Sequence, residues 1–235
     1  MDYPLGYDTA LEDQIARSWA DATVSFVEPM EAGQEVPNEA IKATPAQMHL
    51  HAPSEHTIDG KSFDVEIHFV NLFESMENGT TYTKAAVIGV MFDRAAGGSE
   101  SNEFLQDIID LHKAKLSDSQ DSKNTVTVDV SKLDLDTSKY YHYQGSLTTP
   151  PCSEIVEWHV LDTVQSISKA QLDYIKTFTT SWSTSSDGAT NGNNRMTMPI
   201  NSRTVYKSFM QEADSASTLF VGAVSFLALA SAVAF

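Results

Sequence analysis

Three histidines lie at alternating positions in two short, apolar segments of this chain. His49 and His51 belong to Gln47-Met48-His49-Leu50-His51, and His68 belongs to Glu66-Ile67-His68. In a β-strand, residues i and i+2 point to the same face, so Gln47 shares a face with His49 and His51, and Glu66 shares one with His68. If the two strands are neighbours, the three imidazoles converge. The pattern therefore predicts a β-sheet that carries a metal site.

The predicted ligand set is typical of a catalytic zinc site. Three neutral nitrogen ligands leave a tetrahedral zinc ion one open position, which a structural site does not have. Gln47 and Glu66 are placed to accept the second ring N–H of a ligating histidine and so to fix its tautomer. Iron and copper also accept three imidazoles, so the ligands alone do not choose the metal. A structural or adventitious metal site is the remaining alternative.

Three further segments carry a family resemblance. They are Ala52-Pro53-Ser54-Glu55-His56-Thr57-Ile58-Asp59-Gly60, Tyr143-Gln144-Gly145-Ser146-Leu147-Thr148-Thr149-Pro150-Pro151-Cys152-Ser153-Glu154 and Asn193-Asn194-Arg195-Met196-Thr197-Met198-Pro199-Ile200-Asn201-Ser202-Arg203. With the histidines, they make the chain resemble an α-class carbonic anhydrase over residues 20–207. The segments occur in the order that this family has.

The resemblance implies a role for each matching residue. His49, His51 and His68 would bind zinc, and Gln47, Glu66 and Asn193 would contact these histidines rather than the metal. Thr148 would accept a hydrogen bond from zinc-bound hydroxide and donate its own proton to Glu55. This relay would orient the hydroxide toward carbon dioxide, the expected substrate, which is converted reversibly to bicarbonate.

The resemblance also implies a substrate pocket with two sides. Thr149 would line the polar side. The apolar wall would be formed by Val70, Val87, Leu147, Val156 and Trp158. Strand parity supports part of this wall independently, since Val70 shares the face of His68 and Val156 that of Trp158.

The N-terminal part is shorter than the resemblance leads us to expect. Only 48 residues precede His49, and neither a Trp-rich opening nor a Ser-Pro-Ile-Asn-like strand is present among them. The family's proton-shuttle histidine would fall at residues 18–23, where the sequence is Ser-Trp-Ala-Asp-Ala-Thr. We therefore expect no histidine shuttle. Either another group or buffer carries the proton, or the gene model is truncated.

Two other functions stay open at this stage. A carbonic-anhydrase-like binding domain would keep the fold with little catalysis, as the reduced N-terminal part suggests. A cupin-type iron protein also uses His-x-His on a strand, but it gives no role to the segments around Glu55 and Thr148. Zinc content and carbon dioxide hydration separate the three possibilities.

The remaining pattern predicts a mostly β fold of the α+β type. We expect one domain built on a large, twisted, mainly antiparallel sheet with short peripheral helices. Residues rich in β-branched and aromatic side chains predict strands at 22–27, 46–51, 64–73, 84–92, 125–130, 140–145 and 155–161. Helices are expected at 103–111 and 169–177, the second capped by Ser168, and a hairpin turn at Asn78-Gly79.

Charge and the two ends of the chain bear on partners and location. With 15 basic and 32 acidic residues, the net charge of −17 argues against nucleic acid as a partner.

We expect an irregular segment at 1–19, the catalytic domain at 20–210 and an uncharged, largely apolar tail at 215–235. Such a tail predicts membrane attachment, by a transmembrane span or an exchanged lipid anchor, with an extracellular or lumenal catalytic domain. Cys152 is the single cysteine, so it cannot form an internal disulfide.

Overall fold

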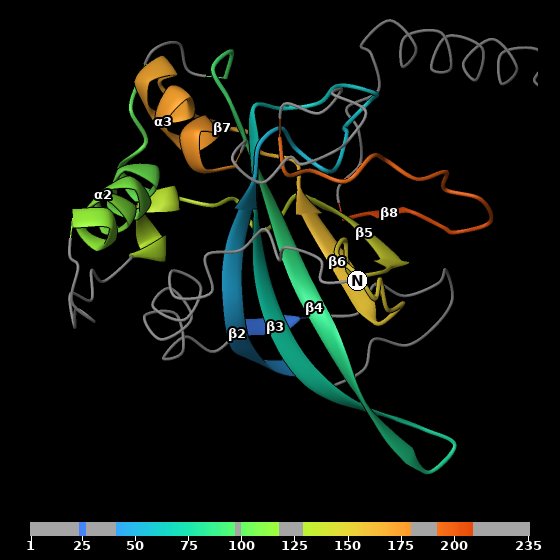
Figure 1. The fold of residues 1–235 in the computed structure, drawn as a ribbon. Coiled ribbons are helices and arrows are strands. Elements are labelled where there is room, and N and C mark those ends of the chain that lie inside the picture. The colour runs from blue at the N-terminus through green and yellow to red at the C-terminus, as the bar shows by residue number, and fades with distance from the viewer. Residues whose placement is uncertain (1–23, 27–40, 97–99, 118–128, 180–191, 209–235) are drawn as a thin grey trace, which may run out of the picture.

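One large sheet organises the chain (Figure 1). The structure, a computed structural model, describes residues 24–26, 41–96, 100–117, 129–179 and 192–208. Its strands are β1 (Val24–Phe26), β2 (Ile41–His51), β3 (Val65–Glu77), β4 (Thr80–Asp93), β5 (Tyr140–Gly145), β6 (Val156–Leu161), β7 (Gln165–Ser166) and β8 (Tyr206–Lys207). They lie in the order β1-β2-β3-β4-β6-β5-β8, with β7 also pairing with β4.

The sheet is mainly antiparallel, as the sequence predicts, but not wholly so. The pairs β1–β2, β2–β3, β3–β4, β5–β6 and β5–β8 are antiparallel. The pairs β4–β6 and β4–β7 are parallel. A parallel pair needs a long crossover connection, and the chain between β4 and β6 supplies one that includes a helix and β5.

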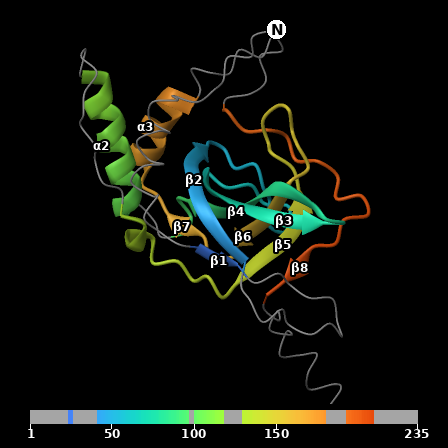
Figure 2. The ribbon, with the colours of Figure 1, turned by 90° about the horizontal axis from the view of Figure 1, so that it is seen from below.

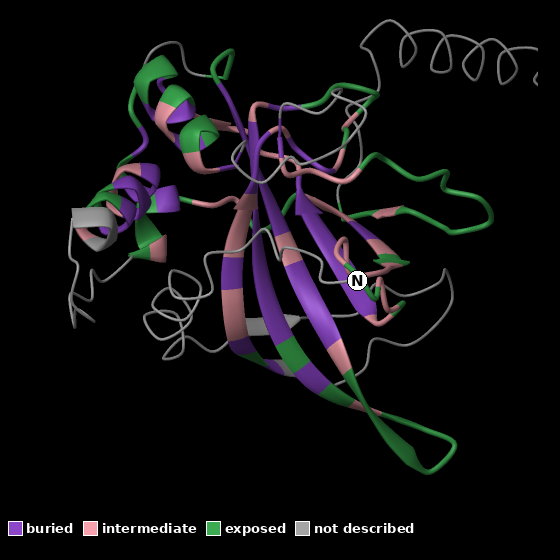
Figure 3. Ribbon diagram, in the orientation of Figure 1, coloured by how far each residue is buried: buried purple, intermediate pink, exposed green. Residues whose placement is uncertain are grey.

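The turn between β3 and β4 confirms the predicted hairpin. Asn78 and Gly79 have φ angles of 51° and 79°, the left-handed values that a two-residue hairpin turn requires. Both strands run beyond their predicted limits toward this turn. The extension consists mostly of exposed residues, so hydrophobic patterning gave no signal for it (Figure 3).

A bulge in β2 determines which face of the sheet carries the predicted metal-site residues. Pro45 lies opposite Asn71 and Gln47 lies opposite Val70, so Ala46 has no counterpart on β3. Such an extra residue shifts the alternation of side chains by one position. It brings Gln47, and with it the two histidines that follow, onto the same face as Val70. Proline at a bulge also avoids the loss of a ladder hydrogen bond.

Two helices, α2 (Glu103–Ser117) and α3 (Lys169–Thr179), lie side by side next to the sheet (Figure 2). The backbone N–H of Gln171 donates to Ser168 Oγ at 3.2 Å, which confirms Ser168 as the predicted cap. The main core joins the helices to one face of the sheet. Its fully buried members include Phe69, Phe92, Phe104, Ile108 and Leu172.

One predicted strand is wrong where it can be checked. Of the range 125–130, residues 125–128 lie outside the described residues, and Val130 begins a 3-10 helix (Val130–Leu133). Asp129 caps this helix by accepting a hydrogen bond from the backbone N–H of Ser131 at 3.0 Å. The cap favours a helical turn over the extended conformation that the β-branched residues suggested.

A pair of buried histidines lies on the face opposite the predicted metal site. His142 of β5 and His159 of β6 are cross-strand neighbours with ring centroids 4.7 Å apart. Burial lowers the pKa of His142 to about 4 and, together with the nearby His142, lowers that of His159 to about 3. Glu157 Oε2 lies 3.4 Å from His142 Nε2.

Acidification should therefore destabilise the fold through this pair. Both pKa values lie below the ordinary histidine pKa of 6.5 in an unfolded chain. The contribution of these two histidines to the unfolding free energy is therefore complete above pH 6.5 and is lost as the pH falls toward about 4. From pH 6.5 to 5 we expect the two histidines together to lose on the order of 3 kcal/mol of unfolding free energy. Urea unfolding at both pH values measures it. The double variant His142→Leu/His159→Leu should lose less, and an equal loss in both proteins would contradict this assignment.

Candidate metal centre

The register of β2 and β3 brings the three predicted ligands together. His49 lies directly opposite His68, and His51 is the next residue on the same face. The ring centroids of the three imidazoles are 4.7 to 5.0 Å apart. His51 and His68 are almost fully buried, whereas His49 is half-buried.

Each imidazole has one ring nitrogen next to an oxygen acceptor. His49 Nδ1 is 2.6 Å from Gln47 Oε1, His51 Nδ1 is 3.3 Å from the carbonyl oxygen of Asn193, and His68 Nε2 is 2.7 Å from Glu66 Oε1. An acceptor at one nitrogen fixes the proton there and leaves the lone pair on the other. The lone pairs therefore belong to Nε2 of His49 and His51 and to Nδ1 of His68.

Those nitrogens are spaced as ligands of one small ion. One ligating atom from each histidine lies within 4.8 Å of the others. Nε2 of His49 and Nδ1 of His68 are 3.2 Å apart, although neither carries a proton in these tautomers. Two nitrogens bound to one tetrahedral zinc at about 2.05 Å would be roughly 3.3 Å apart. The separation thus matches shared coordination.

The electrostatics of the cluster also suit a cation. Burial, with the two neighbouring imidazoles, holds the pKa of His49 well below its usual range, and burial lowers that of His51 to about 4. Both rings are neutral at pH 7 and can donate lone pairs. His51 Nε2 is buried and has no hydrogen-bond partner among the described residues. A buried polar atom without a partner is costly unless a ligand satisfies it.

Glu66 is held by four donors. Its Oε2 accepts from the backbone N–H groups of Glu55 and His56, each at 2.8 Å, and its Oε1 faces the rings of His56 and His68 at 2.6 and 2.7 Å. Burial alone would raise the pKa of Glu66, but the two imidazoles hold it well below the usual range. The same pairing raises the pKa of His56 against the effect of its burial.

Two glycines make room for these contacts. A Cβ on Gly89 of β4, which lies opposite His68, would be 3.0 Å from Glu66 Oε1. A Cβ on Gly192 would be 2.0 Å from the carbonyl oxygen of Ala52. The close approach at Gly192 allows the next residue, Asn193, to bridge Leu50 O and Ala52 N, each at 3.0 Å.

The predicted apolar wall forms a single cluster beside the ligands. Its members Val70, Val87, Val156 and Trp158 are buried together, with Leu147 packed against them. The Trp158 ring lies 4.7 Å from the rings of both His68 and His56. Thr149 is half-buried in the following turn, where its carbonyl oxygen accepts from the N–H of Cys152 at 2.8 Å.

The predicted relay from Thr148 to Glu55 is not made in this structure. Glu55 Oε1 accepts from the backbone N–H of Arg195 at 2.7 Å. Glu55 Oε2 has no hydrogen-bond partner among the described residues, and instead lies 3.3 Å from His51 Nε2 without the alignment of a hydrogen bond. The carboxylate is thus turned toward the ligand nitrogens. Hydrogen bonds of a catalytic site are often completed only when the site is loaded.

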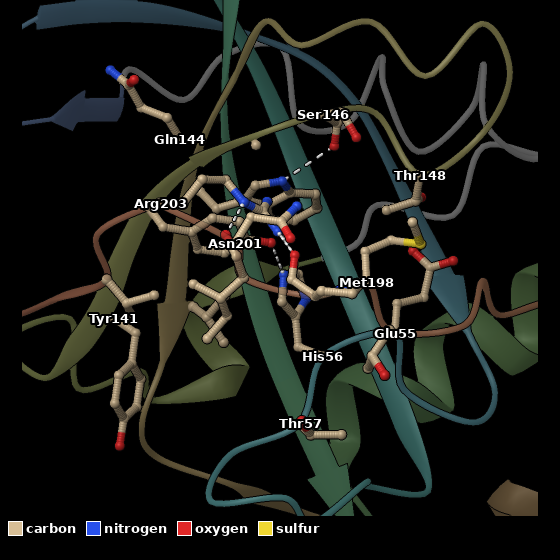
Figure 4. Close-up of a pocket in the computed structure, with 18 of the residues that line it drawn as sticks. Glu55, His56, Thr57, Tyr141, Gln144, Ser146, Thr148, Met198, Asn201 and Arg203 are labelled. Atoms are coloured by element: carbon tan, nitrogen blue, oxygen red, sulfur yellow. Dashed lines mark hydrogen bonds between the residues drawn. The ribbon is translucent and has the colours of Figure 1, made fainter.

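A cavity of about 720 Å³ lies beside the metal centre (Figure 4). Its lining includes Glu55, His56 and Thr148, together with Met198 and Arg203 of the C-terminal segment. The lining therefore combines residues of the predicted relay with the last motif found in the sequence. The volume is within the range of ligand sites in proteins.

Comparison with known proteins decides the family. The sequence model of eukaryotic-type carbonic anhydrases matches residues 19–209. The chain belongs to this family. Alpha carbonic anhydrase 3 of Arabidopsis thaliana is 36% identical to this carbonic anhydrase family member over 162 residues, which are 68% of this chain and 51% of that one. The chain thus spans about half the length of the curated relatives it matches.

Solved structures agree on the fold. The halotolerant carbonic anhydrase from Dunaliella salina has a TM-score of 0.56 at 30% identity, covering 74% of this chain and 63% of that one. Dioscorin complexed with ascorbate has a TM-score of 0.57 at 27% identity, covering 81% and 77%. The family fold is therefore shared by proteins that carry different names.

Proposed function

We propose that this chain catalyses the reversible hydration of carbon dioxide to bicarbonate and a proton, with zinc held by His49, His51 and His68. The observation that carries the proposal is that each histidine has an acceptor at one ring nitrogen, while the three residues bring ligating atoms within 4.8 Å of one another. Membership of the carbonic anhydrase family supports it independently. Neutral imidazoles suit zinc, and a carboxylate, an amide and a backbone carbonyl fix their second nitrogens.

The residues around the ligands fit this chemistry. With zinc held by His49, His51 and His68, the pKa of a coordinated water would fall to about 7, which would supply a nucleophile at neutral pH. The wall of Val70, Val87 and Trp158 offers carbon dioxide an apolar place beside the nucleophile. Thr148 would orient the nucleophile once its hydroxyl donates to Glu55, because a hydroxyl that donates in one direction can only accept in the other.

A binding function is the second candidate. Dioscorin, a relative that is not named as a carbonic anhydrase, was solved with ascorbate, and it covers more of this chain than the Dunaliella enzyme does. The cavity beside the metal centre and the unmade bond between Thr148 and Glu55 favour this reading. A binding domain would keep the zinc site and hydrate carbon dioxide little faster than buffer does.

Stopped-flow carbon dioxide hydration by the purified, zinc-loaded chain separates the two candidates. We expect a rate well above background that is lost when a chelator removes the metal and restored by zinc. Zinc binding at one ion per chain without any such rate would favour the binding function. Absence of zinc binding would refute both.

Proton export should limit the enzyme. No histidine occupies residues 18–23, where the family's shuttle is expected. Added imidazole buffer should therefore raise turnover severalfold at saturating carbon dioxide while leaving kcat/KM nearly unchanged, because the buffer accelerates only the proton transfer that regenerates the nucleophile. Measuring both parameters over a range of buffer concentrations tests this. A turnover that is independent of buffer would mean that an internal group carries the proton.

Membrane attachment through the tail at 215–235 stays a prediction. The tail lies outside the described residues, and none of the helices within the described ranges has the length and apolar character to cross a membrane. We propose attachment because the tail carries no charge and is nearly as long as a bilayer span requires. Fractionation of the full chain between membranes and buffer tests it.

A further inference from the structure

The hairpin of β3 and β4 projects beyond the rest of the sheet (Figure 1). On β3, pairing with β2 ends at Leu72, so residues 73–77 pair only with β4 among the described strands. On β4, pairing with β6 begins at Ala85, so residues 80–83 pair only with β3 among the same strands. Residues 73–83 therefore form a two-stranded arm with two open edges.

The surface of this arm is prone to pairing with other molecules. Residues 76–83 are all exposed (Figure 3). They include Met76, which is 75% exposed, and Tyr82, which is 48% exposed. Open strand edges that carry exposed apolar side chains act as templates for association, and natural proteins block them with charge, proline or a covering group.

The usual blocking residues are scarce on the arm. Its sequence from 73 to 83 contains no proline and no lysine. Its two acidic side chains make contacts across the hairpin: Glu74 accepts a hydrogen bond from Thr83 Oγ1 at 3.0 Å, and Glu77 lies 2.7 Å from Lys84 Nζ. A different kind of protection is therefore expected.

The tip of the arm carries a sequence signal that the proposed reaction does not use. Asn78-Gly79-Thr80 is the only Asn-x-Ser/Thr triplet in the 235 residues, and such triplets accept N-linked glycans. A Cβ on Gly79 would have no heavy atom within 4 Å, so the turn stands in open space. No hydrogen bond or ion pair joins the Asn78 side chain to the described residues. Its amide is therefore accessible.

We propose that Asn78 is an N-glycosylation site and that its glycan shields the open edges of the arm. The inference rests on the proposed membrane attachment, because a domain held on the extracellular or lumenal side passes through the compartment where glycans are transferred. A glycan is bulky and solubilising, which is what an exposed apolar arm lacks.

The transfer needs one co-reactant, an oligosaccharide joined to a lipid through a diphosphate. Nδ2 of Asn78 forms a bond to the anomeric carbon of the first sugar, while the bond from that carbon to the diphosphate oxygen breaks. The lipid diphosphate leaves with the electron pair of the broken bond, and Nδ2 gives one proton to a base of the transferase. Nothing is oxidised or reduced, and Thr80 stays chemically unchanged.

The modification leaves the metal centre open. Glu77, at the end of β3, lies nine residues beyond His68, which is about 30 Å along a strand. The new bond is made to a side-chain nitrogen, so the backbone of the Asn78-Gly79 turn does not have to change. Zinc binding and carbon dioxide hydration should therefore be the same with and without the glycan.

Two variants remove the glycan by different routes. Asn78→Asp removes the acceptor amide but keeps the turn, since Asp-Gly suits the same hairpin as Asn-Gly. Thr80→Ala keeps Asn78 and destroys the triplet, whereas Thr80→Ser is the matched control that preserves it. The full chain is isolated from eukaryotic cells with a secretory pathway. Mass spectrometry then follows the tryptic peptide 62–84, which lies between Lys61 and Lys84.

We expect one glycan on this peptide in the unmodified chain and in Thr80→Ser, and none in Asn78→Asp or Thr80→Ala. Glycosidase treatment in water enriched in ¹⁸O should convert Asn78 to Asp with the label. A sample kept in the same water without glycosidase corrects for spontaneous hydrolysis of the Asn-Gly amide. A full chain that carries no glycan at Asn78 would overturn the proposal.

The shielding role has its own readout. Both glycan-free variants should aggregate severalfold faster than Thr80→Ser, as followed by light scattering, with equal zinc content. Adding Met76→Lys to Asn78→Asp should slow aggregation again, because a charge on an open edge blocks pairing. Equal aggregation with and without the glycan would show that the shielding role is wrong.

Protease protection in closed membrane vesicles identifies which proposal has failed. A chain that is protected inside the vesicles but unmodified at Asn78 overturns the glycosylation alone. A chain that protease cuts from outside overturns the proposed location and the glycosylation together. Neither result depends on carbon dioxide hydration, so the activity measurement tests the proposed function separately.

Discussion

Replacing His68 with alanine should abolish zinc retention. His68 supplies one of three converging nitrogens, and its Nδ1 lies 3.2 Å from Nε2 of His49. Removing one of three comparable ligands from a site that binds zinc with about 10–16 kcal/mol would cost about 4 kcal/mol, or on the order of 10³-fold in affinity. Metal analysis after dialysis against a mild chelator should find the variant empty and the unmodified protein with one zinc.

A matched control for this experiment is available on the same sheet. His142 is buried, like His68, but lies on the opposite face, where its ring contacts His159. His142→Ala should keep its zinc. Equal zinc content in His68→Ala and His142→Ala would show that the ligands are assigned wrongly.

Replacing Thr148 with alanine should slow carbon dioxide hydration on the order of 10²-fold without loss of zinc, as is usual when one preorganised hydrogen bond is removed. The proposed role of Thr148 is to orient the nucleophile by donating to Glu55. Among the described residues, no hydrogen bond or ion pair joins its side chain to the ligand nitrogens, so metal affinity should be nearly unaffected. Stopped-flow hydration and metal analysis on the same sample separate the two effects.

Thr148→Ser is the control for the relay, because it keeps the hydroxyl and removes only a methyl group. Its rate should stay within about threefold of the unmodified protein, far from the loss expected for alanine. Glu55→Gln should behave like Thr148→Ala, since an amide oxygen is a weaker acceptor than a carboxylate. If Thr148→Ala hydrates carbon dioxide at the original rate, the relay is wrong or chemistry does not limit turnover.

Strand alternation predicted which of the proposed ligands share a face, and the three histidines come together because the two strands are neighbours. Gln47, His49 and His51 alternate on one strand, and Glu66 and His68 on the next, so their shared faces follow from a period of two. The contact of Gln47 with His49, and that of Glu66 with His68, are each made within one strand at a separation of two residues. Short-range contacts of this kind are readable from sequence because the strand itself fixes their geometry.

Contacts between distant segments could not be predicted in this way. Asn193 lies 142 residues from His51, and Tyr143 lies 87 residues from His56. Family resemblance suggested a supporting role for Asn193, but no signal in the sequence linked His56 to Glu66. The crossover that makes β4 and β6 parallel was missed for the same reason, since periodicity reports faces and not the order of strands.

Local capping decided the other differences. Asp129 caps a 3-10 helix where β-branched residues favoured a strand. It does so by accepting a hydrogen bond from the backbone N–H of Ser131, and hydrophobic periodicity does not report such a contact. In the same way, the Asn78-Gly79 turn carries β3 and β4 beyond their apolar positions. The predicted apolar tail at 215–235 lies outside the described residues.

Anomalous diffraction at the zinc edge, from crystals of the zinc-loaded chain, tests the central claim most directly. A single strong peak should lie within about 2.1 Å of Nε2 of His49, Nε2 of His51 and Nδ1 of His68, with a fourth position open on the side of Thr148. Three results would contradict the proposed zinc site. They are a peak next to the opposite ring nitrogens, a fourth ligand from Glu55 that closes the site, and the lack of any peak between β2 and β3.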